Sequence, residues 1–174
     1  MELPNAAYLY TLALIAVGYV GFTAIVLILR QSLGGPLSPL DTLVARLFMG
    51  WGFMITYLSM LPVLLAAFKL GHTAVWRISS ALGGLSFLTL HVGYQVLRGR
   101  MTGEPTPRHL WFHTASGLAL GIVMLANAAA VVPTAVGAIY LAGVTLDMIQ
   151  ASFAFVQHFG FMIDQLRRQR KRLG

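Results

Sequence analysis

The chain has 174 residues, of which 57% are hydrophobic and only 10% are charged, so lipid rather than water is expected to surround most of it. Its formal net charge of +7 comes from basic residues at the ends of apolar runs and in one terminal tail, which excludes a soluble nucleic-acid-binding domain. The absence of cysteine excludes disulfides, iron–sulfur clusters, cysteine-ligated zinc and thiol catalysis.

Five apolar runs follow one another along the chain, each long enough for a membrane helix of about 20 residues. We place them at about 6–29, 42–68, 76–97, 109–132 and 134–163. The first run lacks the basic start and the small-residue cleavage site of a signal peptide, so we expect it to be retained. The sequence therefore predicts an all-α fold, an integral membrane bundle of five transmembrane helices. It forms one domain over residues 1–166, with a basic cytoplasmic tail at 167–174.

The breaks between the runs carry residues that begin and end helices. Ser38 and Pro39 are typical of the N-cap and first position of the second helix, and Thr106 and Pro107 of the fourth. Pro133 makes the last turn tight, which predicts that the fourth and fifth helices are antiparallel neighbours.

Basic residues are divided unequally between the two predicted sides of the membrane. One side carries Arg30, Arg46, Arg98, Arg100, Arg108, Arg167, Arg168, Arg170, Lys171 and Arg172. The other side carries only Lys69 and Arg77. The positive-inside rule then predicts the N-terminus outside and the C-terminus inside, and we expect the plasma (inner) membrane. The tail is either a topology signal alone or a segment that also rests on anionic lipid.

The last run carries polar residues along one face. Plotted at about 100° per residue, five of them gather on that side. They are Tyr140, Asp147, Gln150, Gln157 and His158. Asp147 lies near mid-membrane, where a charge costs at least about 2.5–3.5 kcal/mol. We predict that this stripe lines a path; the alternative is a buried helix joined to its neighbours by side-chain hydrogen bonds.

No cationic partner for Asp147 is evident at its depth. The nearest candidates are the neutral residues Tyr57, Ser116 and Asn127. An acid in this position is either protonated or hydrated, and both states suit a proton or cation path better than an inert core.

Three histidines are predicted at similar depth near the cytoplasmic side. They are His91, His113 and His158, each from a different helix. Three imidazoles at one level could ligate a metal ion, hold haem b axially as a pair, or relay protons. The rotation of each helix about its axis is not given by the sequence, so three separate interfacial histidines are the alternative.

Packing signals accompany these polar groups. Gly117 with Gly121 and Ala138 with Ala142 form small-xxx-small faces on the fourth and fifth helices. Pro62 is expected to kink the second helix. Aromatic residues near the predicted span ends are interpreted as an aromatic belt at the membrane interfaces. These are Tyr8, Tyr10, Trp51, Trp76 and Trp111.

The leading functional hypothesis is an oligomeric ion or proton channel or a small transporter, not an enzyme. Five helices make a thin bundle, so a pore would form between the subunits of a homo-oligomer, with the fifth helix lining it. Asp147 would attract cations, while Gln150, Gln157 and His158 would line the inner half. The partners are then the lipid bilayer and a small ion or proton, with no nucleic acid and no required cofactor.

Two other hypotheses stay open. One is a membrane redox subunit that binds haem b or a metal ion through His91, His113 and His158. The other is an accessory subunit of a larger membrane complex, in which the polar stripe of the fifth helix is buried against another protein.

Overall fold

The computed structural model describes residues 3, 5–34, 39–103, 108–129, 131 and 136–173, and of these it leaves aside the side chains of 33, 34, 108, 109 and 161–173. The described residues form five helices and contain no strand, which confirms the all-α prediction. The helices are α1 (Ala6–Gly34), α2 (Pro39–Ala67), α3 (His72–Thr102), α4 (Arg108–Ala128) and α5 (Val136–Leu173). α2 begins at Pro39, as predicted. The predicted caps Ser38, Thr106 and Pro107 and the turn residue Pro133 lie outside the described residues.

Four of the five helices are long and apolar enough to cross a membrane, which indicates an integral membrane protein. The apolar segments are Ala6–Ser32, Pro39–Ala67, Leu110–Ala128 and Val136–Gly160. α3, which covers the run predicted at 76–97, is not among the four. It carries Arg77, His91 and Arg98 along its length, and these polar side chains lower its hydropathy.

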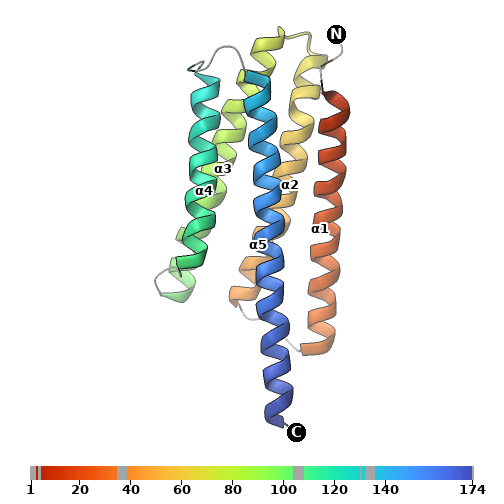
Figure 1. Ribbon diagram of the computed structural model, residues 1–174, viewed down its shortest axis with the longest axis vertical. Helices are drawn as coiled ribbons and strands as arrows, with labels where there is room; N and C mark the ends of the chain where they lie inside the picture. Colours follow the sequence, from red (N-terminus) through yellow and green to blue (C-terminus); the bar gives the residue numbers. More distant parts are fainter. Residues whose placement is uncertain are drawn as a thin grey trace.

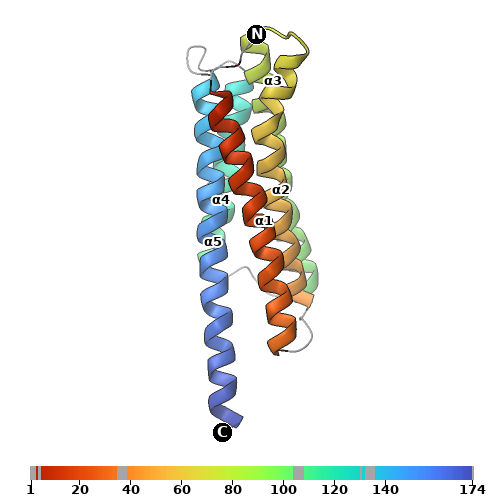
Figure 2. The same cartoon turned by 90° about the vertical axis from the view of Figure 1, so that its right-hand side faces the viewer.

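The helices run up and down along one common axis (Figures 1 and 2). The N-terminus and the α2–α3 link lie at one end, here called the N-terminal end, and the C-terminus lies at the other. α1 packs on α2 and α3 packs on α4, while α5 contacts all four other helices. α4 and α5 are antiparallel neighbours, as predicted. α5 continues beyond the other helices at the C-terminal end, through the basic segment to Leu173.

Glycines bring α3 and α4 into close contact. A Cβ added at Gly84 would lie 2.8 Å from the carbonyl oxygen of Gly121, so neither helix could carry a larger residue there without moving. Gly117 receives the ring of His91, which a Cβ would overlap. The predicted small face of α4 therefore packs on α3. Ala138 and Ala142 on α5 are exposed, so their face contacts no other described helix.

Pro62 and Tyr140 form a structural pair between α2 and α5. Proline has no N–H, so Pro62 leaves the carbonyl of Leu58 without its usual helical donor. The hydroxyl of Tyr140 donates to this carbonyl at 2.5 Å, and the Tyr140 side chain is fully buried. Tyr140 therefore satisfies the backbone group that the proline exposes.

The N-terminal half of the bundle is a packed apolar core. Its fully buried side chains include Ile55, Leu58, Phe87, Met124 and Val144, contributed by four helices. Trp76 also belongs to this core, with an exposed fraction of 2% and its ring packed on Tyr140. The belt interpretation is therefore wrong for Trp76, because α5 covers the tryptophan. A cavity with several polar residues in its wall lies in the other half of the bundle.

Candidate functional site: a histidine-lined cavity beside Asp147

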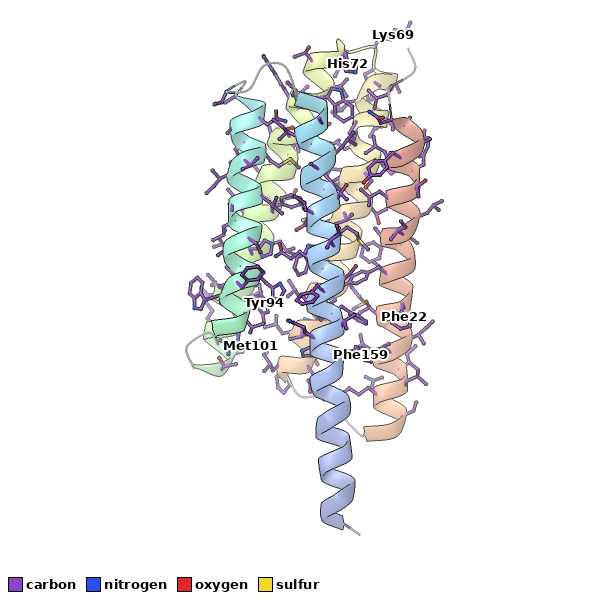
Figure 3. All side chains as sticks on the ribbon, viewed as in Figure 1. Phe22, Lys69, His72, Tyr94, Met101 and Phe159 are labelled. Atoms are coloured by element: carbon purple, nitrogen blue, oxygen red, sulfur yellow. The ribbon has the colours of Figure 1, made fainter. Side chains whose placement is uncertain are left out.

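A cavity of about 200 Å³ lies in the C-terminal half of the bundle, between α2, α3, α4 and α5. Its wall extends from Trp51, near the middle of α2, to Leu40 and Leu110 in the first turns of α2 and α4. Most of the wall is apolar or aromatic. Figure 3 shows one of its aromatic residues, Tyr94, in the C-terminal half, far from Lys69 and His72 at the opposite end. The polar part of the wall includes His91, Arg98, His113, Thr114, Gln157 and His158.

The three histidines singled out from the sequence all line this one cavity. His91 comes from α3, His113 from α4 and His158 from α5, so the tertiary packing brings together side chains that are distant in the chain. Among the described residues, no three histidines or acids are grouped closely enough to hold a metal ion. The cavity therefore gathers imidazoles along its wall rather than at one point.

Two glutamines of α5 hold His113. Gln150 Nε2 donates to the His113 carbonyl at 2.6 Å, and His113 Nε2 lies 3.2 Å from Gln157 Oε1. An amide oxygen only accepts, so His113 Nε2 carries the hydrogen in this contact. In the neutral ring the other nitrogen, Nδ1, is then an acceptor, and it is buried without a hydrogen-bond partner among the described residues.

His91 is packed edge-on against Trp51, with ring centroids 5.2 Å apart at 89°. Its Nε2 is buried beside Gly117 and has no hydrogen-bond partner in the described part of the chain. The exposed fraction of His91 is 5% and that of His113 is 8%. Two nearly buried imidazoles with one free nitrogen each are unusual, because buried polar atoms normally find a partner in the protein or in ordered water.

Asp147 lies one side chain beyond the cavity wall. It is fully buried, and its Oδ2 accepts a hydrogen bond of 2.8 Å from Trp51 Nε1. Its Oδ1 has no hydrogen-bond partner within the described residues. Because Trp51 also lines the cavity, its indole ring separates the carboxyl group from the cavity.

The assignment of Trp51 to an interfacial aromatic belt is wrong. Trp51 is 2% exposed and points into the bundle, because α3 and α5 cover its face of α2. The neutral neighbours expected for Asp147 lie elsewhere: Tyr57 is 47% exposed, Ser116 bonds to the Phe112 carbonyl, and Asn127 donates to Ser80.

His158 lies where the cavity meets a smaller pocket against α1. Its ring is 5.9 Å from that of Phe48, and both residues line both spaces. The smaller pocket is also lined by Arg30 and Asp41, which form an ion pair of 2.7 Å between α1 and α2. His158 therefore lies between the cavity and the ion pair of α1 and α2.

The polar stripe of α5 thus serves two different regions. Gln157 and His158 line the cavity, while Gln150 and Asp147 bond to residues of its wall. Tyr140 lies apart in the N-terminal half, where it bonds to the Leu58 carbonyl.

Sequence reasoning missed Arg98, which it counted only as a topology signal. The Arg98 side chain is 5% exposed and lines the cavity. A signal was available, because Arg98 follows His91 by seven residues and so lies on the same helix face.

Comparison with known proteins gives no further guide: no protein-family model matches the chain, and neither does any curated protein or solved structure.

Proposed function

We propose that the protein is a proton-linked membrane carrier in which Asp147 takes up and releases a proton from the histidine-lined cavity. The observation that carries the proposal is the position of Asp147, fully buried behind Trp51 of the cavity wall. With the C-terminus inside, as the distribution of basic residues predicts, the cavity faces the cytoplasm. The proposed location is the plasma membrane.

The chemistry around Asp147 favours a proton as its ligand. A carboxylate in an apolar site is costly unless it is paired and fully hydrogen-bonded. The one hydrogen bond described for its carboxyl group comes from Trp51. A bound proton removes the charge without any further protein group. His91, His113 and His158 line the cavity beside it, so imidazole nitrogens, which can accept or donate a hydrogen, lie along the proposed route to Asp147.

The packing favours a carrier over an open channel. On the N-terminal side of Asp147 the bundle is filled by fully buried residues such as Phe87, Met124 and Val144. Access from that side requires the helices to separate, as in alternating access. The proposed path lies inside a single chain, because the opposite face of α5 is apolar and exposed at Ile149, Phe153 and Val156. A homo-oligomeric pore is therefore not needed.

The proposal is tested by proton flux in liposomes that contain a trapped pH-sensitive dye and an imposed potassium diffusion potential. The wild-type chain should dissipate the potential faster than protein-free liposomes. Asp147→Asn should lower this flux at least about tenfold, since the amide still accepts from Trp51 but cannot release a proton. Ile149→Val, on the exposed face of α5, is the matched control and should leave the flux unchanged. Equal flux in wild type and Asp147→Asn would contradict the proposal.

A second candidate is a redox subunit, and the free nitrogens of His91 and His113 favour it. The fit is poorer. The cavity of about 200 Å³ is smaller than the roughly 300–1,000 Å³ of pockets that hold drug-sized ligands, so haem would require the helices to move apart. His113 Nε2 is also engaged with Gln157. Visible absorbance of protein purified with added haem, lost in His91→Ala, would support this candidate.

A further inference from the structure

A groove of about 690 Å³ lies on the outside of the bundle between α2 and α3. Its walls include the apolar side chains of Leu43, Leu90 and Leu97, and Arg46 lies among them. Gly93 forms part of its floor, and a Cβ added there would meet nothing within 4 Å. The groove is therefore an open apolar channel along the surface that the bundle presents to lipid.

The groove and the histidine-lined cavity are neighbours. Leu47 from α2 and Tyr94 from α3 line both spaces, so two side chains form the partition between them. Figure 3 shows Tyr94 in the C-terminal half of the bundle, with Met101, another residue of the groove, nearer the C-terminal end. A ligand that passes from the groove to the cavity would therefore have to displace these two side chains.

The size and the walls of the cavity define what could enter. An engineered protein cavity of about 150 Å³ takes up benzene, so a space of this order accepts one substituted six-membered ring. Phe48, Trp51 and Tyr94 provide aromatic walls. His113 Nδ1 is a buried acceptor that lacks a donor, and a ligand hydroxyl would supply one.

We propose that the cavity and the groove together bind a membrane-soluble amphiphile that has a single hydroxylated ring and a hydrocarbon tail, as in a benzoquinol. The ring enters the cavity between Leu47 and Tyr94, where its hydroxyl donates to His113. The tail lies in the α2–α3 groove against Leu43, Leu90 and Leu97. This site goes beyond the proton carrier and does not depend on it, because binding requires no flux.

Gly93 offers a substitution that fills the groove without disturbing the core. Gly93→Phe should place a ring where the tail lies, since nothing stands within 4 Å of the added Cβ. Gly50→Phe is the matched control. Gly50 is exposed on α2, an added Cβ there also meets nothing within 4 Å, and it lines neither the groove nor the cavity.

The experiment measures quenching of tryptophan fluorescence by decylubiquinol in nanodiscs of phosphatidylcholine. A Trp111→Phe background removes the exposed indole, and Trp51 on the cavity wall is the reporter. Saturable quenching that is lost in Trp51→Phe is expected. Gly93→Phe should weaken binding at least about tenfold, while Gly50→Phe should change it less than twofold. A tail-free methylhydroquinone should bind Gly93→Phe and Gly50→Phe equally.

Three results would overturn the site. Quenching that rises linearly with decylubiquinol would indicate partition into lipid only. Equal affinities of Gly93→Phe and Gly50→Phe for decylubiquinol would show that the tail does not lie in the groove. The oxidised quinone carries carbonyl oxygens in place of the two ring hydroxyls. If it bound equally well, no ligand hydroxyl would donate to His113. Asp147→Asn should retain binding while it loses proton flux, so the failure of either proposal is recognised separately.

Discussion

The two halves of the bundle contain buried polar groups but use them differently. In the N-terminal half, Tyr140 bonds to the Leu58 carbonyl, and Asn127 joins Ser80 to the Val136 carbonyl. Among the described residues there, Ser59, Ser79 and Asn127 each have a neutral buried atom without a partner, and Arg77 has its buried Nε, in a guanidinium that keeps its charge. In the C-terminal half the unpartnered atoms of the described residues belong to histidines and to Asp147. Histidines and an acid with unpartnered atoms, in or behind the wall of a cavity, are the reason that we propose the C-terminal half as the functional one.

The comparison teaches that polarity inside a membrane bundle is not by itself a sign of function. Tyr140 and Asp147 belong to the same stripe of α5 and are both fully buried. The tyrosine bonds to a backbone carbonyl that proline leaves free, whereas the aspartate accepts from Trp51 in the cavity wall. Three substitutions would sharpen or break this distinction.

The largest effect is expected from Gly117→Leu in the C-terminal half. The new side chain would overlap the ring of His91 and push α3 away from α4. Overpacking of this kind costs about 1–3 kcal/mol of the free energy of unfolding, or more where backbone must move. Thermal unfolding in detergent should show the loss, and proton flux should fall with it. The control Gly18→Leu, where an added Cβ meets nothing within 4 Å, should unfold like the wild type.

Tyr140→Phe should affect stability alone. It leaves the Leu58 carbonyl buried without a donor, which costs about 1–3 kcal/mol of the free energy of unfolding. Proton flux and ligand binding at the cavity should remain at the wild-type level, measured at a temperature where both proteins are folded. A loss of proton flux with unchanged stability would show that Tyr140 belongs to the proton path. The proposed difference between the two halves would then be wrong.

The smallest effect on stability is expected from Gln157→Leu in the cavity wall. It removes one hydrogen bond to His113, worth about 0.5–1.5 kcal/mol, in a half-buried position. Its effect on function should be larger, because His113 Nε2 then has no acceptor and the ring is free to reorient. We expect at least a threefold weaker quenching by decylubiquinol. An unchanged affinity would show that Gln157 does not position the histidine.

Much of the fold could be predicted from the sequence, because an apolar run of membrane length in lipid satisfies its backbone hydrogen bonds by forming a helix. The positions of Gly117 and Gly121 also predicted a close helix contact, which α3 and α4 make. α3 is the exception among the spans, since its serines, glycines and other polar residues lower its hydropathy below that of the four apolar helices. Pro133, which lies outside the described residues, correctly predicted that α4 and α5 are antiparallel neighbours.

The site was visible only as separate residues. The α5 stripe and the three histidines could be named, because polar side chains are conspicuous in apolar helices. Trp51 and Arg98 were not assigned to the site, since tryptophan and arginine near span ends are usually interfacial or topological, although the spacing of His91 and Arg98 indicated a shared helix face. Both are buried in the cavity wall, because neighbouring helices cover the faces that carry them.

The sequence by itself determined the helices, their apolar character and the polar face of the last one. Only the tertiary structure decided that His91, His113 and His158 share one cavity. It also decided that Trp51 donates to Asp147, and that Tyr140 donates to the carbonyl that Pro62 leaves free. The physical reason is that the sequence does not fix how each helix is rotated about its own axis. A helix that is apolar nearly all round fits lipid at any angle about its axis, so the interlocking of glycines and large side chains with neighbouring helices fixes which face points inward.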